Sequence, residues 1–177
     1  LRLLGAPKAN EGHADAMLRE LLACCFSYLE LIDSLVGDVV ATLKETGLYN
    51  DTLIVFTADH GDMAGAHGFL SKGSYMYDEI YRIPLLIKPA GPPVAGSRRA
   101  DIVHLIDLTA TFMHTMSGAP CDTMDTHRLQ GASLLPLLNG AAHWDRPVHY
   151  AEYHGDWYGH YSARMVTDGQ WKLVWNL

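Results

Sequence analysis

The sequence has little of several features that mark particular classes of protein. It contains only three cysteines in 177 residues, and Cys24 and Cys25 are adjacent, which suits two thiols on a helix better than a disulfide framework. Basic residues number 13 against 20 acidic ones, a net charge of −7, and the only basic pair, Arg98 and Arg99, lies in a Gly/Pro-rich loop. These shortages argue against nucleic-acid binding and favour a reducing, cytoplasmic compartment.

The sequence also lacks a long apolar run and a recognisable targeting segment. No stretch approaches the roughly 18 apolar residues of a membrane span, so no membrane partner is expected. What remains, 49% hydrophobic and 19% charged residues, is the composition of a folded globular domain. Because the chain starts at Leu1 rather than Met and ends on the strand-like run 171–177, we expect both ends to be cut from a longer protein.

The first two thirds of the chain alternate between helix-like and strand-like patterns. Apolar residues three and four apart predict a long helix over residues 18–43. The nearly unbroken apolar run 52–57 predicts a central parallel strand that is buried on both faces, and the run 83–87 predicts a second strand. Segments 105–116 and 133–138 have helical character. Together these segments predict an α/β body.

The last part of the chain has a different pattern. Segments 148–153, 163–167 and 171–175 predict strands, and the dipeptide Asp168-Gly169 is a strong signal for a two-residue hairpin turn between the last two. We therefore expect an α/β domain over residues 1–140 and the start of a small antiparallel subdomain over residues 141–177.

Ionisable groups and glycines gather where the predicted buried strand ends. Asp59 offers a carboxylate and His60 an imidazole, while Gly61 permits the sharp exit that keeps both near the strand tip. One divalent cation could take both ligands; alternatively, Asp59 caps the turn that follows. Calcium takes six to eight oxygens and zinc usually four ligands, so further ligands must come from elsewhere. Read without context, His67 is a loop histidine packed on glycines and Lys72 is a solvated charge.

The order of the short motifs after this strand resembles the C-terminal half of a sulfatase of the alkaline phosphatase superfamily. The motifs are Asp-His-Gly (59–61), Gly-x-His-Gly (65–68), Lys-Gly (72–73), Tyr-Asp-Glu (77–79) and Arg-Ile-Pro-Leu-Leu-Ile (82–87). Further segments that resemble the family are 32–37, 47–57, 105–111, 131–138 and 151–155. The resemblance covers nearly the whole chain and implies part of an alkaline-phosphatase-like α/β/α sandwich.

The resemblance also implies roles for individual residues. Asp59 and His60 would bind the active-site divalent cation, with Ca²⁺ favoured and Mn²⁺ or Zn²⁺ left open by the imidazole. Lys72 would contact the sulfate oxygens as a catalytic and substrate-binding residue. His67 would be a second catalytic residue, one that supports the residues in contact with the substrate. His154 is either on the substrate-binding side or a surface histidine.

One part of the family pattern is missing from the sequence. Sulfatases use a formylglycine made from the first residue of Cys/Ser-x-Pro-x-Arg, preceded by an Asp-Asp metal pair, and neither motif occurs here. We therefore expect the nucleophile in a missing N-terminal part, and this chain alone to be inactive. The complete enzyme would hydrolyse small-molecule or saccharide sulfate esters through a covalent sulfo-enzyme intermediate; a homo-oligomer is compatible with the sequence. The alternatives are a phosphonate monoester or phosphodiester hydrolase, and a non-catalytic binding module or inactive relative.

Overall fold

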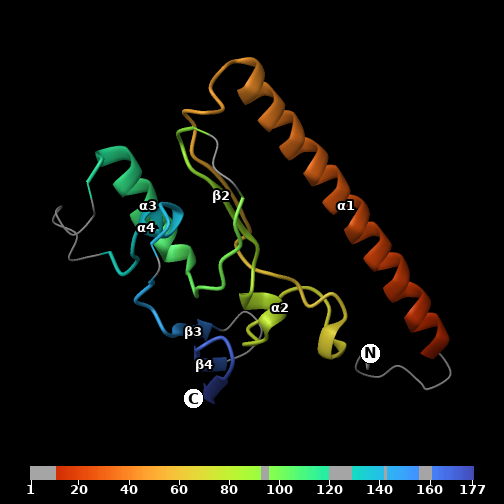
Figure 1. Ribbon diagram of the computed structural model, residues 1–177. Coiled ribbons are helices and arrows are strands. Elements are labelled where there is room, and N and C mark those ends of the chain that lie inside the picture. Colours follow the sequence, from red (N-terminus) through yellow and green to blue (C-terminus); the bar gives the residue numbers. More distant parts are fainter. Residues whose placement is uncertain (1–10, 93–95, 120–128, 142, 156–160) are drawn as a thin grey trace. The chain divides into compact units, whose positions relative to one another are not determined.

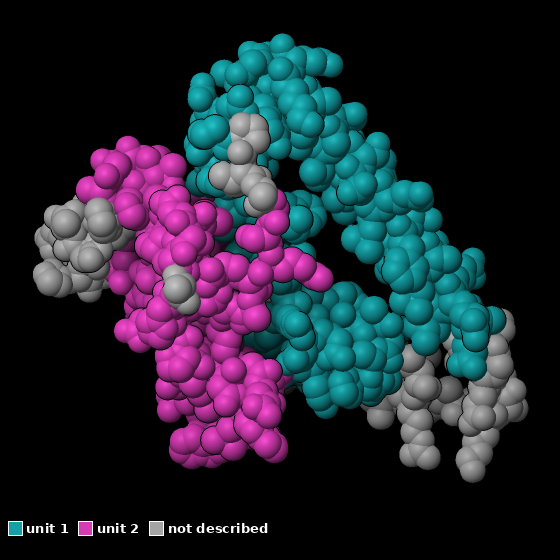
Figure 2. Space-filling view, viewed as in Figure 1, with its two compact units in different colours: residues 1–94 teal, residues 95–177 magenta. Residues whose placement is uncertain are grey.

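A computed structural model describes residues 11–92, 96–119, 129–141, 143–155 and 161–177. The chain divides into two compact units, residues 1–94 and 95–177 (Figure 2). Each unit has its own small sheet. The expectation of a mixed α/β protein is confirmed, whereas the predicted boundary at residue 140 stays a prediction. No helix in the described part of the chain is both long and apolar enough to cross a membrane.

The first unit begins with one long helix, α1 (Glu11–Glu45), which is continuous along its whole length (Figure 1). It extends beyond the predicted range 18–43 at both ends. Leu18, Leu22 and Leu43 are half-buried, but other members of the predicted apolar face are exposed, among them Leu29 at 57% and Val39 at 60%. The periodicity therefore predicted the helix correctly. Within the described part of the chain, however, only some of the apolar side chains on this face of α1 are packed against other residues.

The strand predicted after this helix is present, but its predicted environment is wrong. β1 (Ile54–Thr57) pairs antiparallel with β2 (Leu85–Lys88), with Ile54 opposite Lys88 and Thr57 opposite Leu85. Its residues are half-buried or exposed, with Phe56 38% exposed, rather than buried on both faces. An apolar run indicates that a strand tends to be buried, but it does not indicate whether the neighbouring strand is parallel or antiparallel.

The second unit is organised around a buried carboxylate in its main helix, α3 (Leu105–Ser117). Asp107 is 0% exposed and accepts hydrogen bonds from the backbone N–H of His104 and of Ala132, both at 2.8 Å. Arg146 Nη1 lies 3.1 Å from Asp107 Oδ1. The short helix α4 (Leu135–Leu138) follows, and Leu108, Ala110, Leu134 and Leu137 form the nearby core. Buried and fully bonded, Asp107 fixes the segment before α4 to the start of α3.

The unit ends in the predicted antiparallel sheet, which is confirmed. The strands β3 (His149–Gly155), β4 (Tyr161–Thr167) and β5 (Lys172–Asn176) pair in that order. Residues 168–171 connect the last two, so the hairpin starts at Asp168-Gly169 as predicted but its loop has four residues rather than two. Ala163 and Met165 of β4 are buried. The other face of the sheet carries exposed apolar side chains: Tyr150, Leu173 and Trp175. The sheet is therefore buried on one face only, as alternation along antiparallel strands allows.

Two half-buried histidines meet where α3 and β3 begin. His149 Nδ1 lies 2.9 Å from His104 Nδ1, and the ring centroids are 4.1 Å apart. Burial holds the pKa of His104 below its ordinary 6.5, with Asp107 opposing the shift and Arg146 adding to it. Burial also lowers the pKa of His149, helped by His104 and then Lys172 against Asp107. Both rings are therefore held in the neutral form near pH 7.

This pair predicts that the second unit loses stability as the pH falls. Because both pKa values are lower in the folded chain, the unfolded chain takes up more protons below about pH 6.5, so stability is complete above that pH and decreases below it. Thermal melting at about pH 7.5 and about pH 5.5 measures the loss. We expect a smaller difference in Tm for His149→Gln than for the unsubstituted protein. His143→Gln, at an exposed histidine, is the control. If the difference in Tm between the two pH values is equal in all three proteins, the histidine pair does not cause the loss of stability.

Candidate functional site

The site predicted at the end of β1 brings a carboxylate and an imidazole together. Asp59 Oδ2 lies 3.4 Å from His60 Nε2, and the Asp59 side chain is 85% exposed against 37% for His60. Asp59 Oδ1 accepts a hydrogen bond of 2.9 Å from the backbone N–H of His60. One carboxylate oxygen is thus bound by the next backbone N–H, while the other faces the imidazole. Capping would need an N–H two or three residues further on, so this bond does not decide that alternative.

The other ring nitrogen of His60 decides what Nε2 can do. His60 Nδ1 lies 2.8 Å from the carbonyl oxygen of Gly61, which can only accept, so Nδ1 carries the proton. In the neutral ring Nε2 then presents a lone pair toward Asp59. Two acceptors 3.4 Å apart repel unless a proton or a cation lies between them. A backbone carbonyl that orients the non-ligating nitrogen is also the usual support of a metal-binding histidine.

The surroundings keep the Asp59 carboxylate ionised. Its pKa is lowered chiefly by the hydrogen bond from the His60 backbone, against an opposing effect of burial, and to a lesser extent by the charge of Lys72. The effect of Lys72, thirteen residues further along the chain, is the smallest of these.

Backbone packing fixes the direction in which the chain leaves β1. Gly61 N–H donates to the carbonyl of Ile80 at 2.8 Å, and a Cβ at Gly61 would overlap the carbonyl oxygen of Glu79. The short helix α2 (Asp78–Tyr81) thus lies directly against the backbone of Gly61. The buried apolar side chains of this segment are Met63, Met76 and, within α2 itself, Ile80. Only glycine allows this approach, which holds Asp59 and His60 at the strand tip.

His67 and His154 have partners of their own. The His67 ring stacks on Tyr77 with centroids 4.1 Å apart, and its Nε2 lies 3.5 Å from Glu79 Oε1. His67 is thereby tied to the segment that packs on Gly61, and its role in the site stays a prediction. His154 belongs to the other compact unit, where Nε2 lies 3.5 Å from Glu152 Oε2 on the exposed face of β3. Its substrate-binding role stays a prediction.

Asp59 and His60 could supply only part of the coordination shell of a cation. Within the described ranges, no three histidine, cysteine, aspartate or glutamate side chains come together in a way that could hold a metal ion. Asp59 and His60 fit one cation as two adjacent ligands, by donor type and by spacing. That they bind a metal, with further ligands from elsewhere, stays a prediction.

Sequence reasoning missed an aromatic cluster in the same segment. The rings of Phe69 and Tyr75 stack at 4.5 Å, and each lies within 6.4 Å of the Tyr77 ring. The burial of residues 74–77 alternates, with Ser74 and Met76 buried and the tyrosines more exposed. This alternation could have been read from the sequence, but the stack depends on the path of the loop.

Comparison with known proteins agrees with this geometry. The family described as Sulfatase matches residues 6–119. This chain belongs to the sulfatase family. A second family, described as N-sulphoglucosamine sulphohydrolase, C-terminal, matches residues 65–176 of the sulfatase chain.

Curated relatives cover most of the sulfatase chain. It is 37% identical over 149 residues to the multifunctional alkaline phosphatase superfamily protein PehA of Trinickia caryophylli, which covers 82% of the chain and 28% of that protein. It is 31% identical over 173 residues to arylsulfatase K of Danio rerio, covering 94% of the chain and 31% of the relative. The chain therefore spans about a third of the length of these relatives.

Solved structures show the same partial match. A putative sulfatase from Bacteroides thetaiotaomicron superposes with a TM-score of 0.76 at 26% identity, over 90% of this chain and 34% of that one. A protein in complex with its substrate D-glucosamine-2-N,6-O-disulfate gives 0.71 at 28% identity, over 82% and 29%. The phosphonate monoester hydrolase of Silicibacter pomeroyi gives 0.70 at 30% identity, over 82% and 30%. The mixed α/β fold thus matches one portion of the sulfatase fold.

Proposed function

We propose that this chain supplies one side of the active site of an enzyme that hydrolyses sulfate esters. The observation that carries the proposal is the pairing of the Asp59 carboxylate with a lone pair on His60, 3.4 Å apart, just after β1. Membership of the sulfatase family supports it. In the complete protein, residues 1–140 would form part of an α/β/α sandwich and residues 141–177 the beginning of the antiparallel subdomain.

The proposed roles follow from the chemistry of each group. Asp59 Oδ2 and His60 Nε2 would hold a divalent cation, most plausibly Ca²⁺, with Mn²⁺ or Zn²⁺ as alternatives because one ligand is nitrogen. A bound cation supplies electrostatic stabilisation of the negative charge on sulfate oxygens. The Lys72 ammonium would also bind sulfate oxygens, and it would be in position before negative charge develops on them in the transition state. His67 would keep the loop in position, and His154 would contact the substrate.

The nucleophile of the proposed reaction is not among the residues of this chain. The sequence contains no Cys/Ser-x-Pro-x-Arg, so a formylglycine would come from another part of the protein, and the 177 residues alone would be inactive. Small-molecule or saccharide sulfate esters are the proposed substrates. The saccharide class is supported by the similar structure that contains a disulfated glucosamine.

Activity of the protein expressed from its whole gene tests this proposal. We expect hydrolysis of an aryl sulfate and of glucosamine 6-sulfate, loss of activity on treatment with a chelator, and recovery when Ca²⁺ is added back. A Cys-x-Pro-x-Arg or Ser-x-Pro-x-Arg in the same gene is the matching observation. Absence of any sulfate-ester hydrolysis, with the metal present, would exclude the sulfatase assignment and leave a binding module or an inactive relative.

A second candidate function has an observation in its favour. The chain is 30% identical to the matched part of a phosphonate monoester hydrolase, and its site residues suit a phosphonate oxygen as well as a sulfate oxygen. The same preparation should therefore be assayed with a phosphonate monoester and a phosphodiester. A kcat/KM for either that exceeds that for every sulfate ester would replace the sulfatase proposal with this one.

A further inference from the structure

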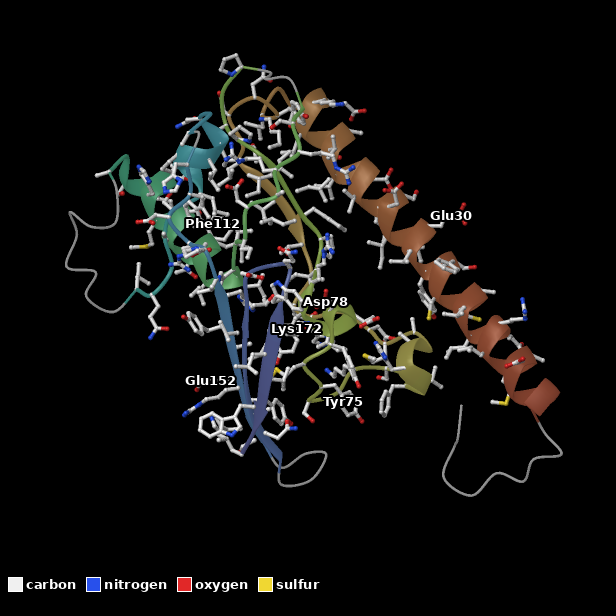
Figure 3. All side chains as sticks on the ribbon, turned by 60° about the horizontal axis from the view of Figure 1, so that its bottom comes forward. Glu30, Tyr75, Asp78, Phe112, Glu152 and Lys172 are labelled. Carbon is white, nitrogen blue, oxygen red and sulfur yellow. The ribbon has the colours of Figure 1, made fainter. Side chains whose placement is uncertain are left out.

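Lys72 lies at the middle of a loop that is closed by an aromatic stack. Phe69 and Tyr75 are the residues three positions before and three positions after it. Their ring centroids are 4.5 Å apart and the rings are inclined by 30°, a stacked arrangement. Figure 3 labels Tyr75 on the loop that leads into α2. The stack therefore joins the two ends of the short segment that carries the lysine.

Two backbone features hold the same loop. The carbonyl oxygen of Ser71 accepts a hydrogen bond of 3.0 Å from the N–H of Met63, which is 1% exposed. The Tyr75 ring lies so close to Gly73 that a Cβ there would overlap it. The backbone hydrogen bond thus lies directly before Lys72, and the contact with the Tyr75 ring lies directly after it.

The stack belongs to this loop rather than to the core of the unit. In the extended segment 74–77, Ser74 and Met76 are 6% and 5% exposed and fill the interior, whereas Tyr77 is 37% exposed and Tyr75 is half-buried. The Tyr75 ring packs against Phe69 and lies 6.2 Å from the Tyr77 ring. Its principal contacts are therefore with the residues that flank Lys72.

We propose that Phe69 and Tyr75 are positioning residues that fix the backbone of Lys72 for contact with the oxygens of the substrate's sulfate. This inference rests on the proposed function. A lysine side chain is long and flexible, so its ammonium stabilises developing charge efficiently only if the backbone that carries it is held in advance. A displacement of about 1 Å in such a group can cost on the order of a hundredfold in rate.

The matched variants are Tyr75→Leu, which removes the aromatic ring, and Tyr75→Phe, which keeps it. In the protein expressed from its whole gene, we expect Tyr75→Leu to lower kcat for a sulfate ester by about tenfold with a smaller change in KM. Tyr75→Phe should stay within about twofold of the unsubstituted protein. Tyr28→Leu, at an exposed tyrosine of α1, controls for the substitution itself.

A double-mutant cycle separates positioning from a general structural effect. If Tyr75 acts through Lys72, Tyr75→Leu should cause little further loss in a Lys72→Ala background. An equal loss in both backgrounds, or a Tyr75→Leu enzyme with full kcat, would overturn the inference while leaving the sulfatase proposal intact. A chain that hydrolyses no sulfate ester without any substitution would overturn the proposed function and this inference with it.

Discussion

Replacing Lys72 with alanine is expected to lower kcat/KM for a sulfate ester about a thousandfold in the protein expressed from its whole gene. At about 4 Å and an effective dielectric near 20, one charge contact amounts to on the order of 4 kcal/mol, which corresponds to a factor of about a thousand in rate. The ammonium makes no metal bond, so the metal content measured by elemental analysis should not change.

The structure offers a matched control for this substitution. Lys44 lies in the last turn of α1, 5.2 Å from the centroid of the Tyr49 ring, and Lys44→Ala removes a charge of the same kind away from the site. It should leave both activity and metal content unchanged. A Lys72→Ala enzyme that keeps more than about a tenth of the activity would show that the charge makes no essential contact with the transition state.

Features of the fold that depend on neighbouring residues could be predicted from the sequence, whereas features that depend on distant residues could not. The long helix and the hairpin that begins at Asp168-Gly169 were predicted because their patterns are contained within neighbouring residues, although the hairpin loop is two residues longer than predicted. The direction of β1 was not, because an apolar run does not specify its partner, and β2 lies some thirty residues further on. The burial of Asp107 depends on Ala132 and Arg146, which are distant in sequence, so its central role could not be read from the helix pattern.

The candidate site also contains features that could be predicted from neighbouring residues and features that could not. Asp59 and His60 were predicted as a pair because both follow a strand directly, and their mutual distance of 3.4 Å is set by adjacent backbone. The link between Lys72 and Asp59 came only from the family resemblance, because no local pattern connects a loop lysine with a carboxylate thirteen residues earlier. The Phe69–Tyr75 stack depends on a positive φ of 63° at Ser71 and on the close approach to Gly73, neither of which has a reliable sequence signal.

Replacing Asp59 with asparagine is expected to lower metal content and activity together. Asparagine has nearly the same shape and can still accept the hydrogen bond from the His60 backbone, so the turn should persist while the charge is lost. Hard divalent cations require an ionised oxygen, so the metal-to-protein ratio after gel filtration should fall and kcat/KM should decrease by at least about a hundredfold. Excess Ca²⁺ should restore part of the activity, because His60 and the ligands from outside the chain remain.

Asp62 provides the comparison that makes this result specific. It stands three residues further along the same loop, and its Oδ1 accepts a hydrogen bond of 2.7 Å from the N–H of Ala64, so its carboxylate has a backbone role like that of Asp59. Asp62→Asn should leave both the metal ratio and the activity unchanged. If both variants lose metal equally, the effect comes from the charge of the loop as a whole. If Asp59→Asn keeps its metal, Asp59 is not a ligand, and its ionised carboxylate serves the turn and the orientation of His60 alone.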